Sequence, residues 1–271
     1  MIYDYLIIGA GISGAAAAYE LSKQGSVIVI EAENIPGYHS TGRSAALYTP
    51  NYGDPIVRQV NRASKQFLNN PPPGFCHTPL LTQRGQLTVA LPGEDEKLSE
   101  ILAQSVPEDP IERISAAEAC DIAPLLDPAF VESATLEPGV ADIEFASLHQ
   151  GYLAAIKRQG GQVICSMRVE AITRKDDVWH VSSNKQTLIG KTLINAAGAW
   201  ADQVAIMAQA TPIGLVAKRR TAIIVDLPTV TRSKAPLPAI DFTDCNGYLK
   251  PEAGKLMVSP GDETPVEPQD A

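Results

Sequence analysis

The residues with the clearest chemical meaning lie near the start of the chain. Residues 5–8 are four apolar residues that predict a buried strand. Three glycines follow at G-x-G-x-x-G spacing, namely Gly9, Gly11 and Gly14. In such a motif the first glycine permits a tight turn, the second lets the backbone approach a pyrophosphate, and the third lets a helix pack on the sheet. A helix beginning at Ile12 or Ser13 would direct its unpaired N–H groups at phosphate charge, so the motif predicts a dinucleotide site.

An acidic residue stands where a dinucleotide site needs one. Residues 27–30 form a second apolar strand, and Glu31 follows it, 22 residues after Gly9. An acid about 20 residues beyond the first glycine binds a ribose 2′-hydroxyl in such sites. The alternative, that the glycines only cap a helix, is weakened because strand, helix and acid all come in the expected order. The carboxylate also disfavours a cofactor with a 2′-phosphate, since two anions would face each other.

Composition limits the classes of partner. The chain has 271 residues, 45% of them hydrophobic, which allows a sizeable core in one large domain or two. A net charge of −9 and an isoelectric point near 5.0 argue against nucleic acid or an anionic membrane as partner. No apolar run approaches the ~20 residues of a transmembrane helix. The acidity itself needs no explanation beyond solubility.

The four cysteines are scattered and form no C-x-x-C pair. None of the four histidines lies at ligand spacing from a cysteine, so we expect no metal site. We therefore interpret the cysteines as reduced, buried, small apolar residues of a cytoplasmic protein: Cys76, Cys120, Cys165 and Cys245. The N-terminus has Asp4 where a secretory signal would carry positive charge.

Two kinds of element must position the glycine motif. The nucleotide part has strands and helices in alternation, which resumes with a helix over 144–159, a strand over 162–165 and short strands at 169–172, 178–181 and 187–189. A buried strand, 192–195, then opens into the small residues that precede Trp200. A further sheet strand ending beside the glycine motif is where an open α/β sheet binds its ligand.

Other segments interrupt this alternation. Helices are predicted over 54–70, over 94–104 and from Ser115, with strands at 86–91, 213–225, 247–251 and 255–258. We predict an α/β protein with a Rossmann-like nucleotide-binding domain and an inserted mixed-sheet α+β substrate domain. The expected boundaries are 1–80 and 141–207 for the first domain, and 81–140 and 208–271 for the second. Residues 260–271 are rich in proline and acids and are expected to be mobile.

Several of these stretches together resemble one protein family. They are residues 9–14, Glu31, 37–46, 149–153 and 195–200. In order and over nearly the whole chain, they resemble the FAD-dependent D-amino-acid oxidase superfamily, and most closely its D-arginine dehydrogenases. The resemblance implies FAD, bound without a covalent link, and it implies these cofactor-binding residues: Gly9, Gly11, Ile12, Ser13, Gly14, Glu31, Ala32, Thr41, Gly42, Arg43, Ser44, Ala45, Ala46, Val169, Ala197, Gly198 and Trp200.

The resemblance also implies a reaction. In this family Cα of an amino acid gives a hydride to flavin N5, and water hydrolyses the resulting imine to a 2-oxo acid and ammonia. An arginine and tyrosines bind the substrate carboxylate, and by motif position they are Arg220, Tyr248 and Tyr52, which we predict to be catalytic and substrate-binding. Alternation along a strand would put Arg219 and Arg220 on opposite faces, and the resemblance selects Arg220.

Two departures from the D-arginine dehydrogenases bear on the substrate. Leu47 stands where those enzymes have a histidine, and Gln86 aligns with their glutamate that faces the cationic side chain of the substrate. An amide cannot pair with a guanidinium as a carboxylate does. We therefore predict that Gln86 binds a neutral or apolar amino acid of the D series.

Members of that family continue well past the position of Ala271. We therefore expect FAD to be weakly bound or absent in these 271 residues, with little activity. Two alternatives stay open: an amine oxidase similar to glycine and sarcosine oxidases, and a non-catalytic nucleotide-binding protein. The expected partners are a small amino-acid substrate and an electron acceptor that the sequence does not identify.

Overall fold

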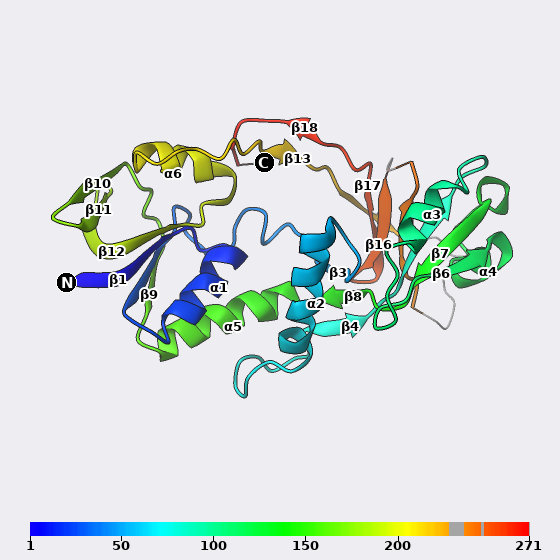
Figure 1. Ribbon diagram of the computed structural model, residues 1–271, viewed down its shortest axis with the longest axis horizontal. Helices are drawn as coiled ribbons and strands as arrows, with labels where there is room; N and C mark the ends of the chain where they lie inside the picture. The colour runs from blue at the N-terminus through cyan, green and yellow to red at the C-terminus, as the bar shows by residue number, and fades with distance from the viewer. Residues whose placement is uncertain (228–235, 245–246, 271) are drawn as a thin grey trace.

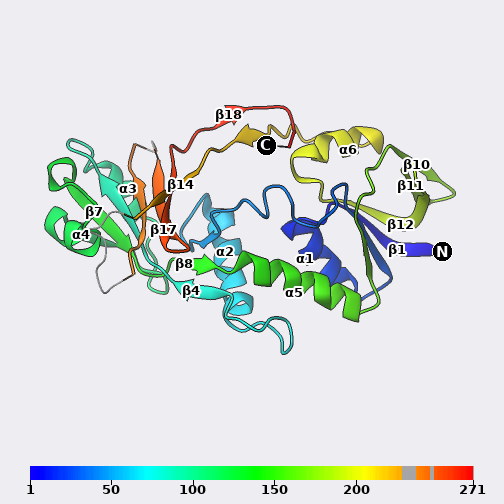
Figure 2. The ribbon, with the colours of Figure 1, turned by 180° about the vertical axis from the view of Figure 1, so that it is seen from behind.

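The computed structural model describes residues 1–227, 236–244 and 247–270. Its two large β-sheets lie at opposite ends of an elongated molecule, and helices and short strands connect them (Figures 1 and 2). This is the predicted α/β class, with several mixed sheets.

The six-stranded sheet carries the glycine motif. Its strands, in spatial order, are β10 (Ala171–Lys175), β11 (Val178–Ser182), β12 (Thr187–Asn195), β1 (Ile2–Ile8), β2 (Val27–Ile30) and β9 (Gln162–Ile164). The four strands from β12 to β9 are parallel, whereas β10, β11 and β12 are antiparallel. Because the register pairs Ile8 with both Ile30 and Asn195, the carboxyl ends of three parallel strands meet.

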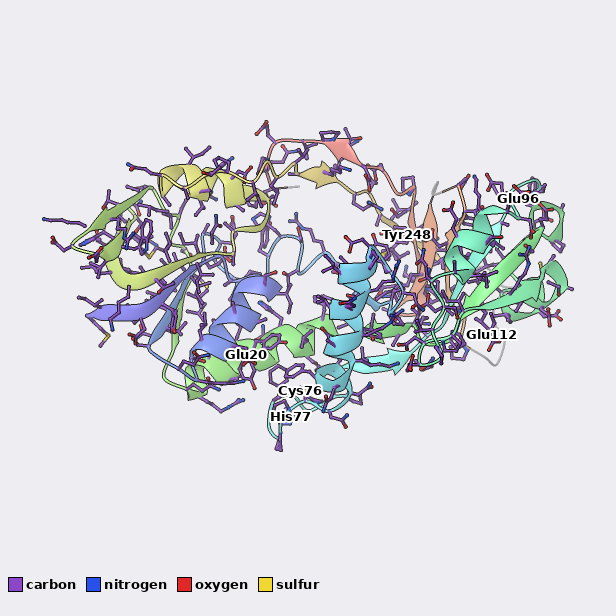
Figure 3. All side chains as sticks on the ribbon, viewed as in Figure 1. Glu20, Cys76, His77, Glu96, Glu112 and Tyr248 are labelled. Carbon is purple, nitrogen blue, oxygen red and sulfur yellow. The ribbon has the colours of Figure 1, made fainter. Side chains whose placement is uncertain are left out.

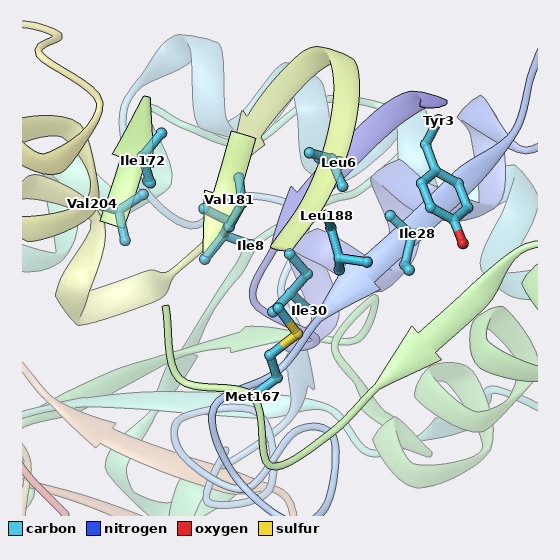
Figure 4. Close-up of a cluster of buried hydrophobic side chains, with 10 residues drawn as sticks. All are labelled: Tyr3, Leu6, Ile8, Ile28, Ile30, Met167, Ile172, Val181, Leu188 and Val204. Carbon is cyan, nitrogen blue, oxygen red and sulfur yellow. The ribbon is translucent and has the colours of Figure 1, made fainter. Parts of the chain in front are cut away.

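Helices cover both faces of this sheet, which explains why all four residues of β2 are buried. Helices α1 (Ile12–Leu21) and α5 (Phe145–Arg158) lie side by side on one face (Figure 1), where Ile7 and Ile156 belong to the same core. Helix α6 (Ala201–Met207) lies on the other face, and its Val204 packs into a core with Leu6 and Ile8 (Figure 4).

The seven-stranded sheet has one apolar and one polar face. Its strands, in spatial order, are β14 (Ile223–Asp226), β17 (Lys255–Ser259), β16 (Tyr248–Glu252), β15 (Ala239–Phe242), β5 (Gln86–Ala90), β7 (Ser133–Glu137) and β6 (Glu112–Ser115). On the apolar face Leu87, Val89 and Ile240 share a core with helix α4 (Ala116–Ile122). Side chains alternate along a strand, so the residues between them point to the opposite face.

Smaller elements connect the two sheets. They are the three-stranded sheet β3 (Leu47–Tyr48), β8 (Ala141–Ile143) and β4 (Leu81–Gln83), the pair β13 (Lys218–Arg219) and β18 (Thr264–Pro265), helices α2 (Pro55–Asn69) and α3 (Lys97–Leu102), and the 3-10 turns at Pro128–Phe130 and Gly198–Trp200. Asp54 caps α2 as its side chain accepts from Ile56 N at 2.8 Å. The predicted domain boundaries stay a prediction. Strand β4 was assigned to the substrate domain and β8 to the nucleotide domain, and the two strands pair in the connecting sheet.

Four predicted elements were wrong in extent. The helix expected over 94–104 is only α3. The two strands expected at 187–189 and 192–195 are the single strand β12, because Gly190 packs on Leu6, whose Cγ would lie 2.6 Å from an added Cβ. The strand expected over 213–225 is two short strands that pair in different sheets. Arg219 ends β13 and Arg220 lies after it, so the expectation that the two side chains point to opposite faces of one strand was wrong.

Two further expectations need correction. Cys76, Cys120 and Cys165 are free thiols as predicted but half-buried rather than buried, and Cys245 lies outside the described residues. The segment expected to be mobile makes defined contacts, since β18 pairs with β13 and Asp270 accepts from Arg43 at 2.8 Å. No helix in the described parts of the chain is long and apolar enough to cross a membrane.

Candidate cofactor and substrate site

A cavity of about 790 Å³ opens where the carboxyl ends of β1, β2 and β12 meet. This volume lies within the ~300–1,000 Å³ typical of small-molecule sites. Much of the predicted cofactor set lines it: Gly9, Gly11, Ile12, Ser13, Glu31, Ala32, Thr41, Val169, Ala197, Gly198 and Trp200.

The turn between β1 and α1 has no room for side chains. Gly9 has φ +102°, and a Cβ added there would lie 2.3 Å from the Ala196 carbonyl oxygen. A Cβ on Gly14 would lie 1.9 Å from the Gly9 carbonyl oxygen, whereas one on Gly11 would be 3.2 Å from Thr41 Oγ1. The first and third glycines are therefore required by close packing, and the second leaves its backbone open to the cavity.

Helix α1 begins at the cavity with unused hydrogen-bond donors. Its N-cap, Gly11, provides no side-chain cap, and Ser13 is exposed. The Ile12 amide donates to Thr41 Oγ1 at 2.9 Å, which fastens the 37–46 loop to the start of the helix. The first-turn N–H groups and the helix dipole together favour an anion at this position.

Glu31 is fixed beside the turn. It is 9% exposed, and its carboxylate accepts from the backbone amides of Ala10 and Glu33, each at 2.9 Å. Each carboxylate oxygen has lone pairs beyond the one used here, so Glu31 can also accept from ribose hydroxyl groups.

His149 supports the turn from below, a role that the sequence did not reveal. This residue of α5 is 4% exposed, and its Nε2 lies 2.8 Å from the Ala10 carbonyl oxygen. Because a carbonyl oxygen only accepts, Nε2 carries the proton. Gly37 is required above the ring, since a Cβ there would lie 2.8 Å from His149 Cε1.

His39, Met167 and Leu215 also line the cavity and were not predicted as cofactor residues, whereas Trp200 was. The His39 and Trp200 rings lie 4.6 Å apart at the rim, and Met167 and Leu215 add apolar lining. His39 belongs to the loop that the sequence singled out, but Met167 and Leu215 stand in no motif. Only the folded chain brings them to the cavity.

Some predicted cofactor residues do not line this cavity. Gly14 packs beneath the cavity. The loop leaves the cavity after Thr41 and runs to β3 through Gly42, Arg43, Ser44, Ala45 and Ala46. Arg43 pairs with Asp270 and lies 5.0 Å from the centre of the Tyr38 ring. These residues therefore lead from the cavity to β3, and on the way the Ala45 carbonyl oxygen accepts from Lys250 of the seven-stranded sheet.

The predicted substrate residues lie in part on the polar face of that sheet. Tyr248 is directly opposite Asp241, on the side of the sheet toward α2 (Figure 3), and β15 pairs in parallel with β5, which begins at Gln86. Burial raises the pKa of Asp241, while the charge of nearby Arg220 acts in the opposite direction. Arg220 is exposed and donates to Glu263 at 2.9 Å.

Tyr52 belongs to another part of the structure. It is 71% exposed in the turn before α2 and lines a second cavity beside that helix. The structure thus brings Gln86, Tyr248 and Arg220 near one sheet face.

The model of the FAD dependent oxidoreductase family, DAO, matches residues 4–271. The chain belongs to this family. Among curated relatives, the mitochondrial dimethylglycine dehydrogenase of Rattus norvegicus is 22% identical over 262 residues, which are 95% of this chain and 30% of the relative. The chain thus spans less than a third of that relative's length.

Solved structures of DAO-type fold superpose closely. L-α-glycerophosphate oxidase from Mycoplasma pneumoniae with FAD bound has a TM-score of 0.85 at 22% identity, covering 100% of this chain and 73% of that one. L-proline dehydrogenase from P. horikoshii has a TM-score of 0.84 at 22% identity, covering 99% of this chain and 72% of that one. Glycine oxidase from Geobacillus kaustophilus has a TM-score of 0.79 at 18% identity, covering 97% of this chain and 72% of that one.

FAD is the cofactor of the DAO family, and the residues present fit its adenosine diphosphate half. The glycine turn excludes side chains where a diphosphate would lie, α1 offers uncapped N–H groups, and Glu31 presents a fixed carboxylate. FAD supplies an acceptor for a hydride when it is bound. The chain itself offers N–H groups at which an anion could bind, a carboxylate that could accept from a ribose, and a polar sheet face.

Proposed function

We propose that this chain is the cofactor-binding and substrate-binding part of an oxidoreductase that oxidises the Cα–N bond of an amino acid, giving a 2-oxo acid and ammonia. The observation that carries the proposal is the contact between the polar sheet face and the loop that leaves the cofactor cavity. Lys250, two residues after Tyr248 on that face, donates to the Ala45 carbonyl oxygen at 2.7 Å. The predicted flavin loop and the predicted substrate residues therefore lie next to each other.

In this proposal the cavity holds the adenosine diphosphate of FAD, which is bound without a covalent link. The diphosphate lies at the start of α1, Glu31 accepts from the ribose hydroxyls, and residues 42–46 contact the flavin. Support comes from the fixed Glu31 carboxylate and from the path of the loop, which begins at the lining residue Thr41.

Arg220 is proposed to bind the carboxylate of the substrate, with Tyr248 and Tyr52 as hydroxyl donors. A guanidinium binds a carboxylate with two parallel N–H donors, which fixes Cα for transfer. Arg220 already holds a carboxylate, that of Glu263, at 2.9 Å. A substrate carboxylate would replace Glu263, and the exposed side chain of Tyr52 is free to turn toward the substrate.

Gln86 bears on the side chain of the substrate. A neutral amide at this position favours a neutral or apolar D-amino acid over D-arginine. The closeness to D-arginine dehydrogenases and the D stereochemistry stay predictions, as do the electron acceptor and a cytoplasmic location. A second candidate reaction is oxidation of an N-methylated glycine, which the curated relative, a dimethylglycine dehydrogenase, favours.

The experiment is anaerobic reduction of flavin by the purified protein with added FAD. We expect D-leucine and D-methionine to bleach the flavin absorbance bands faster than D-arginine or sarcosine. A lead for D-arginine would contradict the argument from Gln86, and a lead for sarcosine would favour the second candidate. Bound FAD that no amino acid or amine reduces would favour the non-catalytic alternative, and peroxide release in air would separate an oxidase from a dehydrogenase.

Arg220→Met tests the carboxylate site, with Arg219→Met as the matched control. Loss of a charge-assisted pair should raise KM roughly 100-fold for Arg220→Met. Arg219 pairs with Asp262 instead, so its variant should behave as the unchanged protein. Equal effects of the two variants would contradict the assignment.

A further inference from the structure

A buried lysine on the polar sheet face joins the two proposed sites but has been given no role in binding a ligand. Lys250 of β16 is 4% exposed. An ammonium group has three N–H donors, and burying it is unfavourable unless they are paired. Its Nζ lies 2.7 Å from the Ala45 carbonyl oxygen, 2.6 Å from Glu252 Oε2 and 3.5 Å from Asp142 Oδ1.

These three acceptors come from three parts of the molecule. Ala45 belongs to the loop that leaves the cofactor cavity, Asp142 to β8 of the connecting sheet, and Glu252 to the same strand as Lys250. Asp142 is itself held by Arg84, whose Nε donates to Oδ2 at 2.8 Å. The ammonium of Lys250 therefore joins the loop to the seven-stranded sheet, through its own strand, and to the three-stranded sheet, through Asp142.

The backbone that Lys250 contacts is in an unfavourable conformation. Ala46 has φ +52°, in the left-handed region that a residue with a Cβ rarely adopts. Such a residue persists when its surroundings determine its conformation, and such residues cluster at ligand sites. The Ala46 amide donates to Ser44 Oγ at 3.0 Å, and the Ala46 carbonyl accepts from Ile143 N at 2.7 Å. Lys250 holds the remaining group, the Ala45 carbonyl oxygen.

The same loop offers donors that the protein does not use. Within the described parts of the chain, the amides of Ser44 and Ala45 donate to no protein acceptor. Backbone N–H groups are strong donors, and those near a bound ligand are satisfied by it. These two donors belong to the peptide groups between residues 43 and 45, so the orientation of those groups decides where the donors point.

We propose that Lys250 is a positioning residue for the cofactor. By holding the Ala45 carbonyl, it fixes the peptide between Ala45 and Ala46. This restrains Ala45 and the two peptide groups before it, whose Ser44 and Ala45 amides then point toward the flavin half of the site. The inference rests on the proposed placement of the flavin against residues 42–46. Lys250 itself contacts neither substrate nor flavin, and it acts only through the loop.

The test compares two ligands that differ by the flavin. ADP probes the adenosine half of the site, and FAD probes both halves. We expect the unchanged protein to bind FAD at least tenfold more tightly than ADP. Lys250→Met should lower FAD affinity about tenfold, or about 1.4 kcal/mol, and leave ADP affinity unchanged. Lys255→Met is the matched control, because Lys255 lies on the adjacent strand, is exposed and pairs with Asp226; both affinities should stay as in the unchanged protein.

Hydrogen exchange separates the inference from the proposed function. In Lys250→Met, without any ligand, the Ala46 and Ile143 amides should exchange at least tenfold faster, whereas those of β1 and β2 should not change. Unchanged exchange at Ala46 and Ile143 would overturn the role of Lys250, whatever the affinities. Faster exchange in a protein that binds FAD no more tightly than ADP would overturn the flavin placement instead, and the inference with it.

Two further variants keep the test decisive. Lys250→Arg retains a charged donor and should keep most of the preference for FAD over ADP. If Lys250→Met does not fold, Glu252→Gln weakens one partner of the ammonium and should give a smaller loss in the same direction. Parallel losses of FAD and ADP affinity in either variant would indicate general destabilisation and overturn the proposal.

Discussion

Substitution of Gly14 by alanine tests the packing that creates the anion site. The added Cβ would lie 1.9 Å from the Gly9 carbonyl oxygen and 3.3 Å from Ala196 Cβ. Carbon and oxygen approach to ~3.3 Å at closest, so α1 has to move away from the turn by more than about 1 Å. Overpacking of this kind costs about 1–3 kcal/mol, and we expect the upper end because one neighbour is backbone.

The same movement should weaken nucleotide binding. A shift of about 1 Å lengthens the hydrogen bonds between the first-turn amides and a diphosphate, and each such bond contributes about 1.5–3 kcal/mol. We expect the Kd for ADP, measured by titration calorimetry, to rise at least tenfold, and urea denaturation to show the loss of stability.

Gly254→Ala is the control for this substitution. Gly254 lies between β16 and β17 with φ +79° and no atom within 4 Å of an added Cβ, so the variant has conformational strain of about 1–2 kcal/mol and no clash. Its stability should fall while its affinity for ADP stays unchanged. The reasoning would be refuted by a Gly14→Ala protein that binds ADP normally, or by equal loss of ADP binding in both variants.

Three other predictions concern the same two sites. Glu31→Gln keeps a single oxygen acceptor, so either the Ala10 amide or the Glu33 amide loses its partner, and the negative charge near the ribose is removed; the affinity for ADP, measured by calorimetry, should fall about tenfold, and the affinity for adenosine 2′,5′-diphosphate should fall less. His149→Phe leaves the Ala10 carbonyl without its buried donor and should lower the free energy of unfolding in urea by about 1–3 kcal/mol. Burial raises the pKa of Asp241 above its ordinary 3.8, so the folded protein keeps a proton that the unfolded chain releases, and stability falls as the pH rises from about 3.8 through the folded pKa. Asp241→Asn should therefore be more stable than the unchanged protein at pH 7 and equally stable below pH 3.8. The free energy of unfolding of both proteins would be measured in urea at the two pH values, and a difference between them that is the same at both would contradict the argument.

The nucleotide part of the fold could be predicted because its signals are local. The apolar strand, the glycine turn and α1 follow one another in the sequence, and parallel pairing then brings Glu31 to the turn. Helix α2 was also predicted well, since Asp54 and Pro55 mark its start and the Asn-Pro run its end. Each of these elements needs no information from distant residues.

The remaining parts depend on distant contacts. Residues 213–225 have the composition of one strand, but β13 pairs with β18 and β14 pairs with β17, so tertiary pairing divides the segment. Gly190 looks like a break between strands, and only the position of Leu6 shows why it continues one. The support of the turn by His149 and of the loop by Lys250 likewise joins residues more than a hundred positions apart.

The candidate substrate site shows the same limit. Tyr248 and Asp241 share a face through the register of β15 and β16, which no sequence motif encodes. The resemblance selected Tyr52, whose side chain is 71% exposed in the turn before α2, and its role stays a prediction. The placement of side chains across separate elements is thus where the sequence is least informative.

The central claim is that the turn after β1 and the carboxylate of Glu31 together hold the adenosine diphosphate of FAD. A crystal structure of this protein grown with ADP tests it most directly. We predict the diphosphate at the start of α1, within hydrogen-bonding distance of the Ser13 amide, and the ribose hydroxyls on Glu31. ADP bound elsewhere, or a turn that closes on itself with Glu31 directed away from the ligand, would contradict the claim.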